Sequence, residues 1–176
     1  DDAFWRSLGA DDPIASLSAF EPNDRILGAN EDRLDRVADA FALVIDAKSP
    51  WTHQHSRGVA DLTVAIAKTM GYPADQLRDA RRAALLHDIG KLGVSSLILD
   101  KPGRLTDEEF TAVRKHPADT REILKRTGCF SHLANLAAAH HERLDGTGYN
   151  LGLSKSELSL ISRVLCTADI CDALRA

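Results

Sequence analysis

The sequence is poor in aromatic residues and in cysteine, and each shortage excludes a class of protein. Only 5% of the 176 residues are aromatic, against 44% that are hydrophobic, so the core must consist mainly of aliphatic side chains and alanine. The three cysteines, Cys129, Cys166 and Cys171, include no C-x-x-C spacing and are too few for a disulfide scaffold. We therefore expect a protein of a reducing, cytoplasmic compartment.

The chain also lacks a basic cluster and a long apolar run. The net charge is −4 and no block of Lys and Arg stands out, which argues against DNA or RNA binding by a basic face. No run of about 18 apolar residues and no signal peptide occur, so we expect no membrane span. The chain has no initiator Met and reaches Ala176 inside a helical pattern, so we expect a truncated C-terminus and an excerpt of a longer protein.

Helical periodicity is what the sequence has in abundance. Apolar residues recur every third or fourth position from Leu34 to Ile45, which predicts an amphipathic helix. We predict further helices at about 52–70, 73–87, 106–116, 117–127, 131–143 and 154–176, two of them opened by capping boxes at Thr106 and Ser154. The fold class is therefore all-α, a single helical bundle domain over residues 31–176. Residues 1–30, with two prolines and two glycines, are expected to form a linker or lead-in segment.

Histidine and aspartate carry the chemistry of this chain. Taken alone, each of these residues has an ordinary alternative, such as a surface position, a loop residue or a helix cap. His140 and His141 are the strongest pair, because they follow two apolar turns and would point about 100° apart on a helix, towards two neighbouring ions. Asp169 lies among apolar residues, where a carboxylate needs a partner or a metal, and Asp172 is the alternative for this role. The predicted metal ligands are His55, His87, Asp88, His116, His140, His141 and Asp169.

Five imidazoles and two carboxylates would overfill one ion but suit two ions that share a bridging carboxylate. Asp88 is the predicted bridge, because it lies between two groups of histidines in the chain. Such ligands favour Fe or Mn, with Ni and Zn as alternatives, over Ca or Mg. Two ions of this kind can activate water for cleavage of a phosphate ester. The remaining histidines, His53 and His132, are assigned to the surface.

Several stretches of the chain resemble the HD superfamily of metal-dependent phosphohydrolases, and more narrowly its HD-GYP family. The resemblance runs from about residue 50 to the end of the chain, in the family's order and spacing. The longest of these stretches, HHE-x-x-DG-x-GY, is specific. The matching segments are HSRGVA (55–60), LLHDIGKLGV (85–94), KHP (115–117), HHERLDGTGY (140–149) and TADICDAL (167–174).

The resemblance implies an all-helical domain that hydrolyses cyclic di-GMP to pGpG or GMP through a metal-bridged hydroxide. It assigns the seven residues named above as ligands and gives catalytic roles to Asp88 and Lys91. Lys91 would contact a substrate phosphate, although it could instead solvate a helix end. Asp145, Gly146 and Gly148 belong to the signature loop; Asp145 is as readily a turn residue, and the glycines are expected to have positive φ. Further candidates for substrate contact are Arg57 and Arg143, each of which is as readily in a surface ion pair.

The chain departs from the family pattern at three places. Asn150 stands where the family has proline, which should loosen the loop and affect partner docking. Trp51 stands where three-metal members carry a glutamate, so we predict two ions rather than three. The sequence stops at Ala176, before an arginine and a lysine or tyrosine that hold the substrate in the family.

The sequence therefore leaves three functions open. The first is hydrolysis of cyclic di-GMP, and the second is the same chemistry on another cyclic dinucleotide or a nucleotide. The third is a non-catalytic regulatory module that binds nucleotide or a diguanylate cyclase and signals to upstream or downstream regulatory domains. The complete set of polar ligands argues against the third, because a scaffold does not need such groups in a core.

Overall fold

The structure is a computed structural model, and it describes residues 29–48 and 54–175. The chain divides into two units, residues 1–30 and residues 31–176, and the second is described below. The linker role of residues 1–30 stays a prediction, because almost all of them lie outside the described residues. The expectations for Trp51 and His53 also fall outside that part of the chain.

Helices dominate the described part of the chain, which contains no strand and only one isolated antiparallel bridge, between Asp145 and Ser154. The all-α expectation is thereby confirmed. Within residues 29–48 and 54–175, no helix is long and apolar enough to cross a membrane. The elements are α3 (Glu31–Asp46), α4 (His55–Thr69), α5 (Ala74–Leu86), η2 (Ile89–Gly93), α6 (Ser96–Leu99), α7 (Asp107–Val113), α8 (His116–Arg126), η3 (Gly128–Leu133), α9 (Ala134–Ala137) and α10 (Leu160–Ala173).

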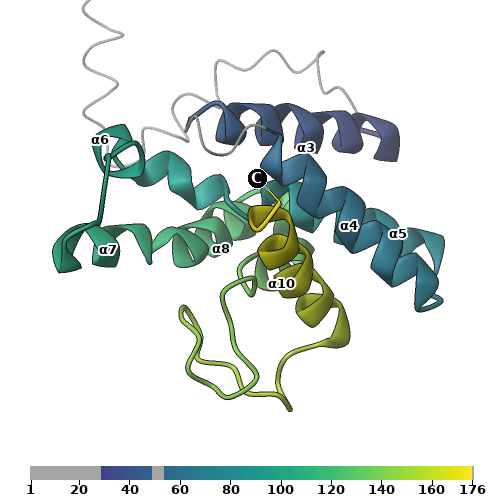
Figure 1. The fold of residues 1–176 in the computed structure, drawn as a ribbon. Helices are drawn as coiled ribbons and strands as arrows, with labels where there is room; N and C mark the ends of the chain where they lie inside the picture. The colour runs from purple at the N-terminus through teal and green to yellow at the C-terminus, as the bar shows by residue number, and fades with distance from the viewer. Residues whose placement is uncertain (1–28, 49–53, 176) are drawn as a thin grey trace, which may run out of the picture. The chain divides into compact units, whose positions relative to one another are not determined.

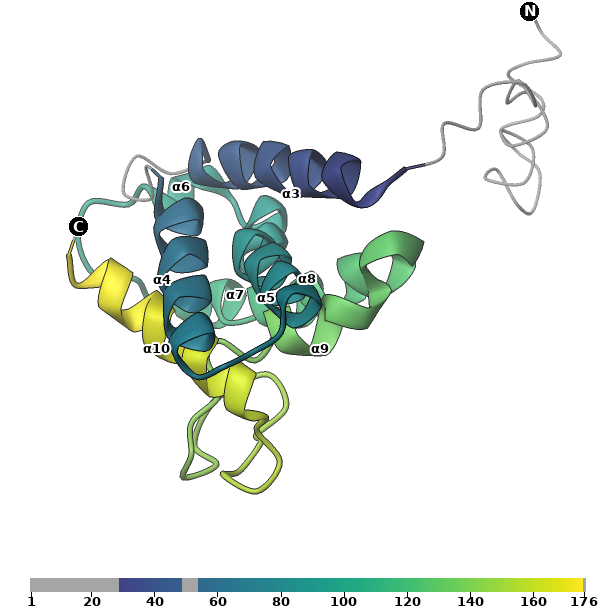
Figure 2. The same ribbon diagram turned by 90° about the vertical axis from the view of Figure 1, so that its right-hand side faces the viewer.

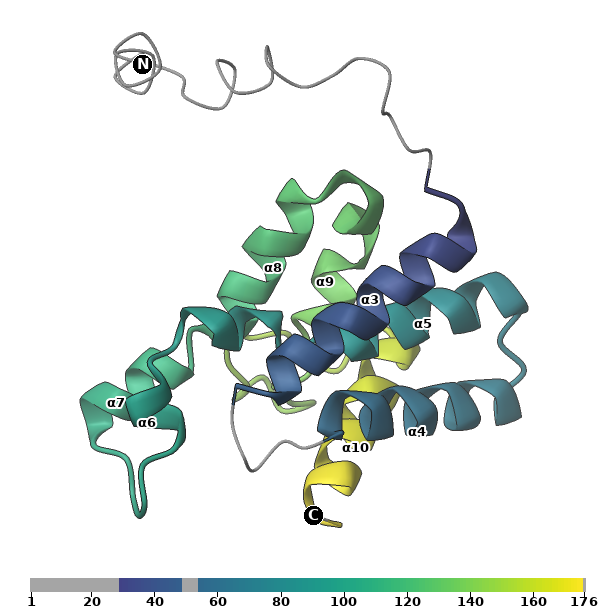
Figure 3. The same cartoon turned by 90° about the horizontal axis from the view of Figure 1, so that it is seen from above.

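The antiparallel pair α4 and α5 forms the centre of the bundle. A turn at Gly71, whose φ of 85° suits a residue without a side chain, joins the two helices. Helix α3 lies across the pair, and α10 packs against α4 at an angle (Figures 1 to 3). Helix α8 packs against η2 and α9 on the other side of α5, and the connection between α9 and α10 projects away from the helices (Figure 1).

Small side chains let these helices approach closely. Eight alanines have 2% or less of their surface exposed in the central cluster, whose bulkiest members are Phe130 and five leucines. Interaxial distance depends on the side chains at the contact, so alanine brings the helix backbones together and the helix ends with them. One buried cation ties α3 to this core: Arg82 donates to Asp35 Oδ1 at 2.6 Å and to the carbonyl oxygen of Glu31 at 2.7 Å.

Two predicted helices have the wrong limits. The helix predicted over 131–143 is short in the structure, because η3 precedes it and α9 already ends at Ala137. At Ser154 only half of the predicted capping box forms, because the Glu157 carboxylate accepts from the amide and the hydroxyl of Ser154 whereas the Glu157 amide donates to the Ser154 carbonyl oxygen. These bonds close a turn and do not begin a helix. Helix α10 begins only at Leu160, with the Ser159 hydroxyl accepting from the amide of Ser162 at 3.1 Å. By contrast, the Thr106 capping box and the start of a helix at Pro117 are confirmed.

Candidate metal centre

All seven predicted ligands come together, six of them from the ends of helices or the residues that follow them. His55 is the first residue of α4, His87 and Asp88 follow α5, and His116 is the first residue of α8. His140 and His141 lie in the turn after α9, and Asp169 is on α10. Their donor atoms form three overlapping groups, in each of which the atoms lie within 4.8 Å of one another. We call the group His55, His87 and Asp169 the first subsite, and the group His116, His140 and His141 the second subsite.

The first subsite contains two imidazoles around a carboxylate. Asp169 Oδ1 lies 3.1 Å from Nε2 of His55 and 3.7 Å from Nε2 of His87. His87 is fully buried and Asp169 is 8% exposed, so little water can solvate this carboxylate.

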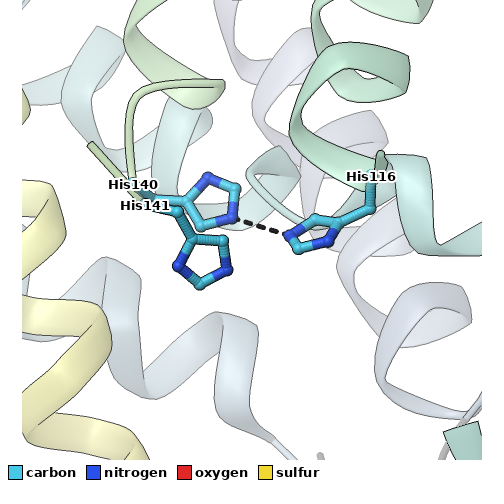
Figure 4. A group of neighbouring side chains, drawn as sticks. All are labelled: His116, His140 and His141. Carbon is cyan, nitrogen blue, oxygen red and sulfur yellow. Dashed lines mark hydrogen bonds between the residues drawn. The ribbon is translucent and has the colours of Figure 1, made fainter. Parts of the chain in front are cut away.

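The second subsite consists of imidazoles alone (Figure 4). Nε2 of His116 and Nε2 of His140 lie 2.9 Å apart, the contact dashed in Figure 4, and the His140 and His141 ring centroids are 4.2 Å apart. His140 and His141 lie beyond the end of α9, so the expected regular-helix geometry is wrong for this pair. Even so, both belong to the same ligand group.

Asp88 lies between the two subsites, as expected of a bridge. Its Oδ2 is 3.4 Å from Nε2 of His87, whereas its Oδ1 is 3.2 Å from Nε2 of His116 and 3.7 Å from Nε2 of His140. The two oxygens of one carboxylate therefore face opposite groups of ligands.

The hydrogen bonds behind the histidines fix the ring orientation. Nδ1 of each of three rings lies against the carbonyl oxygen three residues earlier: His87 on Ala84 at 2.7 Å, His116 on Val113 at 2.7 Å and His140 on Ala137 at 2.8 Å. A carbonyl only accepts, so these Nδ1 atoms carry the proton and the Nε2 lone pairs point into the centre. This is the usual outer arrangement of metal-binding histidines.

Wherever such a ring is neutral, this tautomer turns an acceptor and no donor towards the centre. The Nε2 atoms of His116 and His140 then face each other as two acceptors, a contact that requires a proton or a cation. Nitrogen ligands about 2.1 Å from one ion and at right angles to each other lie about 3 Å apart. Nε2 of His87 and Oδ1 of Asp88 are buried and have no hydrogen-bond partner among the described residues. Buried polar atoms are normally paired, so the donor set fits metal ions.

His141 is oriented differently. No hydrogen bond to its ring nitrogens is found in the part of the chain that the structure describes. Instead, the ring of Tyr149 lies against it, with centroids 4.7 Å apart and planes inclined by 31°. The guanidinium carbon of Arg114 lies 4.5 Å from the centroid of Tyr149. The amide of Tyr149 also donates to the carbonyl oxygen of His141 at 3.2 Å.

The ionisation of the two subsites differs as well. In the first subsite, burial opposes a positive charge on both histidines. For His55, hydrogen bonds to Asp169 and Asp172 outweigh the effect of burial. For His87, the negative charge of Asp88 outweighs it. The pKa of His55 is raised, and that of His87 is raised to about 9. Burial would raise the pKa of Asp169, but its hydrogen bond with His55 and the charge of His87 lower it.

In the second subsite, burial is reinforced by neighbouring positive charge. It lowers the pKa of His141 to about 4 and that of His140 well below its usual value. At the bridge, burial would raise the pKa of Asp88, but the charges of His87 and Lys91 hold it well below the ordinary range.

The residues predicted to contact the substrate lie in different places, and only Lys91 contacts Asp88. Lys91 donates to Asp88 Oδ2 at 2.5 Å, so it lies at the bridge. Arg143 is exposed, 3.5 Å from Asp145, whose carboxylate accepts from the amide and hydroxyl of Thr147 in a local turn. Arg57 lies 3.9 Å from Asp39.

The two glycines of the signature loop serve different purposes. Positive φ is confirmed for Gly146, at 75°, but is wrong for Gly148. Gly148 is required by a close approach, because a Cβ there would lie 2.5 Å from the Cα of Glu142.

The sequence did not predict the roles of three supporting residues: Asp172 was expected only as an alternative ligand, and Thr120 and Glu142 were not singled out. Oδ2 of Asp172 lies 2.8 Å from Nδ1 of His55, so this carboxylate stands behind a ligand and is not an alternative to Asp169. The hydroxyl of Thr120 donates to the carbonyl oxygen of His87 at 2.9 Å and accepts from the amide of Gly90 at 3.0 Å. Glu142 is buried and accepts from the amides of Leu151 and Leu153 at 2.6 and 2.8 Å. The only signal for Asp172 was its position three residues after Asp169, on the same helix face.

The fold and the ligand set correspond to a known family. The chain matches the HD domain family over residues 39–176. It belongs to this family, and within it to the HD-GYP group whose motifs it carries.

Among its relatives are proteins named for phosphodiesterases of cyclic dinucleotides. A 3'3'-cGAMP-specific phosphodiesterase of Vibrio cholerae is 46% identical over 98% of this chain, and a cyclic di-GMP phosphodiesterase of Pseudomonas aeruginosa is 42% identical over 70% of it. The chain spans 38% and 30% of the lengths of these two relatives.

Two solved structures resemble the chain. A cyclic GMP-AMP-specific phosphodiesterase of Vibrio cholerae has a TM-score of 0.55 and 40% identity, covering 98% of this chain and 39% of the other. An HDG"Y"P protein of Bdellovibrio bacteriovorus has a TM-score of 0.61 and 20% identity, covering 83% and 53% of the two chains. The second likeness concerns the fold alone.

Proposed function

We propose that this chain is the catalytic part of a phosphodiesterase that hydrolyses cyclic di-GMP to pGpG or GMP. The observation that carries the proposal is the bridge: two groups of ligand atoms meet at opposite oxygens of Asp88. Adjacent metal ions suit phosphodiester hydrolysis, because together they stabilise the attacking and leaving oxygens. A second candidate substrate is 3'3'-cGAMP, since a relative that is 46% identical is named for it.

The seven ligands would hold two divalent transition-metal ions, Fe or Mn before Ni or Zn. When bound, these ions would supply Lewis-acid charge and an activated water. The first subsite and Oδ2 of Asp88 would hold one ion, and the second subsite and Oδ1 of Asp88 the other.

Lys91 would bind a non-bridging oxygen of the scissile phosphate. Its ammonium group has three donors, and Asp88 accepts from it at 2.5 Å, so donors remain for a substrate at the bridge. Charge aimed at the phosphoryl oxygens stabilises the transition state more than the ground state. Arg143, Asp145, Gly146 and Gly148 are proposed to line the approach of the substrate from the signature loop.

Replacement of the bridge tests this function. In Asp88→Asn, metal content should fall and cleavage of both cyclic dinucleotides should drop more than about 100-fold, beyond the effect of losing an outer partner of a ligand. Asp79→Asn is the matched control, because Asp79 is an exposed aspartate that lies 3.2 Å from the exposed His132. Elemental analysis and product chromatography measure the two effects. Unchanged metal content and cleavage in Asp88→Asn would refute the proposal.

The regulatory alternative makes a different prediction. A binding module would retain a cyclic dinucleotide in the metal-loaded protein without turnover. A diguanylate cyclase partner, flanking regulatory domains and a cytoplasmic location remain predictions from the sequence.

A further inference from the structure

A cavity of about 280 Å³ opens beside the metal centre. Asp88 and Lys91 form one end of it, so it reaches the bridge between the subsites. Its other walls come from the end of α3, from α6 and from the segment that leads to α7. Three lysines, Lys48, Lys91 and Lys101, line it together with aliphatic side chains such as Ile45, Leu99 and Leu105.

The three ammonium groups are held in place but keep unused donors. Lys48 donates to the carbonyl oxygen of Leu92 at 2.6 Å, and Lys101 donates to Glu109 Oε2 at 2.6 Å. Glu109 is itself fixed, because the same oxygen accepts from the amide of Thr106 in the capping box of α7. An ammonium group has three donors, so each lysine can bind a further acceptor. The carbonyl that accepts from Lys48 is neutral, and among residues 29–48 and 54–175 no carboxylate forms an ion pair with this lysine.

The chemistry of this cavity fits part of a nucleotide. The ammonium groups suit phosphate oxygens, and the aliphatic side chains offer an apolar surface to a base. Pockets for whole small ligands measure about 300–1,000 Å³, so a cavity of 280 Å³ is large enough for a portion of a dinucleotide and too small for all of it. Since Lys91 already lies at the bridge, Lys48 and Lys101 are available to a second phosphate.

We propose that this cavity binds one nucleotide half of the substrate, with Lys48 and Lys101 on the phosphodiester that is not being cut. The inference rests on the proposed function and adds a place for the rest of the substrate. Under this proposal, Lys48 and Lys101 determine substrate specificity. A substrate with a single phosphodiester has no second phosphate for them to bind, so they add nothing to its affinity.

Two substrates that differ in this respect provide the test. The metal-loaded chain is assayed on cyclic di-GMP and 3'3'-cGAMP, and on bis(p-nitrophenyl) phosphate, which has a single phosphodiester. In Lys48→Met and Lys101→Met, the methionine keeps the aliphatic stem and removes the charge. Each variant should raise KM for the cyclic dinucleotides about tenfold or more, the effect of one hydrogen bond to a charged group. Hydrolysis of bis(p-nitrophenyl) phosphate should stay unchanged.

A lysine outside the cavity provides the control. Lys125→Met removes a lysine from α8 that pairs with Glu122 at 3.4 Å on the exposed surface, and it should alter neither reaction. An unchanged KM for cyclic dinucleotides in both cavity variants would overturn the inference. So would an equal loss with all substrates, because it would place the lysines in the support of the metal centre.

Failure of the proposed function would look different. The unaltered chain would then cleave none of the three substrates. The dissociation constant of a cyclic dinucleotide for the metal-loaded chain still tests the cavity in that case. A tenfold weakening in Lys48→Met and Lys101→Met, absent from Lys125→Met, would support it, and equal binding in all three would overturn it.

Discussion

The two subsites use the same side chains in different electrostatic settings. The first contains a carboxylate of its own, Asp169, and a second carboxylate, Asp172, behind His55. The second contains three imidazoles and shares only Asp88. Accordingly, the pKa of His87 is raised to about 9 whereas that of His141 is lowered to about 4. The first subsite therefore attracts cations, protons included, and the second presents neutral lone pairs.

The two subsites also differ in what holds their ligands. Hydrogen bonds from behind orient both histidines of the first subsite, His55 and His87. In the second subsite they orient His116 and His140, but His141 has only the flat face of Tyr149 against its ring among the described residues. A hydrogen bond fixes a ring more narrowly than a stacking contact does. We therefore expect the ion of the second subsite to leave first when a chelator is added, and the predictions below separate the two subsites on this basis.

The largest effect is expected from Asp169→Asn. The change removes the anionic ligand that is special to the first subsite and leaves the second intact. Bound metal should fall from two ions to one, and phosphodiester cleavage should fall more than about 100-fold, since losing a ligand exceeds the effect of losing an outer partner. Elemental analysis and steady-state assays measure both. Two ions still bound in this variant would remove the distinction between the subsites.

The second effect is a pH dependence of metal affinity, which we expect in the first subsite because of His87. Below the pKa of about 9, His87 of the metal-free protein carries a proton that an incoming ion must displace. The apparent affinity should therefore rise about tenfold per pH unit from pH 6.5 and level off near pH 9. His140 and His141 of the second subsite should add no such dependence over this range, since their pKa values are lowered.

Mn²⁺ titration at several pH values tests this difference. Asp169→Asn isolates the second subsite, and His141→Ala isolates the first. If Mn²⁺ affinity changed with pH in the same way in both variants, the predicted difference between the subsites would be wrong.

A third effect concerns Tyr149. Tyr149→Ala should weaken the ion of the second subsite about 10- to 100-fold, the range for a lost outer partner, and spare the first. Tyr149→Phe keeps the ring against His141 and should bind normally. If the phenylalanine variant is as weak as the alanine variant, the hydroxyl and not the ring orients His141. Metal competition with a chromophoric chelator measures the affinities.

A fourth, smaller effect is expected when the support of a histidine in the first subsite is disturbed, as Tyr149→Ala disturbs that of His141 in the second. A Cβ at Gly58 on α4 would lie 2.1 Å from Oδ1 of Asp172, the carboxylate behind His55. Gly58→Ala would ordinarily favour the helix by about 1 kcal/mol. Here it should displace Asp172 and weaken the first ion about tenfold. At Gly128 a Cβ meets nothing within 4 Å, so Gly128→Ala is the control. Equal metal affinity in both variants would contradict the role of Asp172.

The sequence was sufficient to predict which histidines and aspartates come together, but not what supports them. These residues are recognisable because buried imidazole and carboxylate are costly without a purpose, and the motif spacing marks them as a group. The supporting contacts of Asp172, Thr120 and Tyr149 depend on how helices meet, which no local pattern encodes. Helix limits failed for a related reason. Ser154 and Glu157 are the residue types of a capping box, yet the Ser154 hydroxyl and amide both donate to Glu157 in a turn, and α10 begins only at Leu160.

The smallest effect is expected at the position where this chain departs from its family. Asn150 has a φ of 100°, in the left-handed region, whereas a proline ring fixes φ near −65°. Asn150→Pro would therefore strain the loop that carries Tyr149, and should lower the free energy of unfolding by roughly 1–3 kcal/mol. Asn150→Gly relieves the same strain and should be neutral or stabilising. Denaturant unfolding of the two variants measures the difference. Because Tyr149 of this loop lies against His141, Asn150→Pro should also weaken the second ion a few-fold and leave the first unchanged. A proline variant as stable as the glycine variant would show that the loop adopts another conformation.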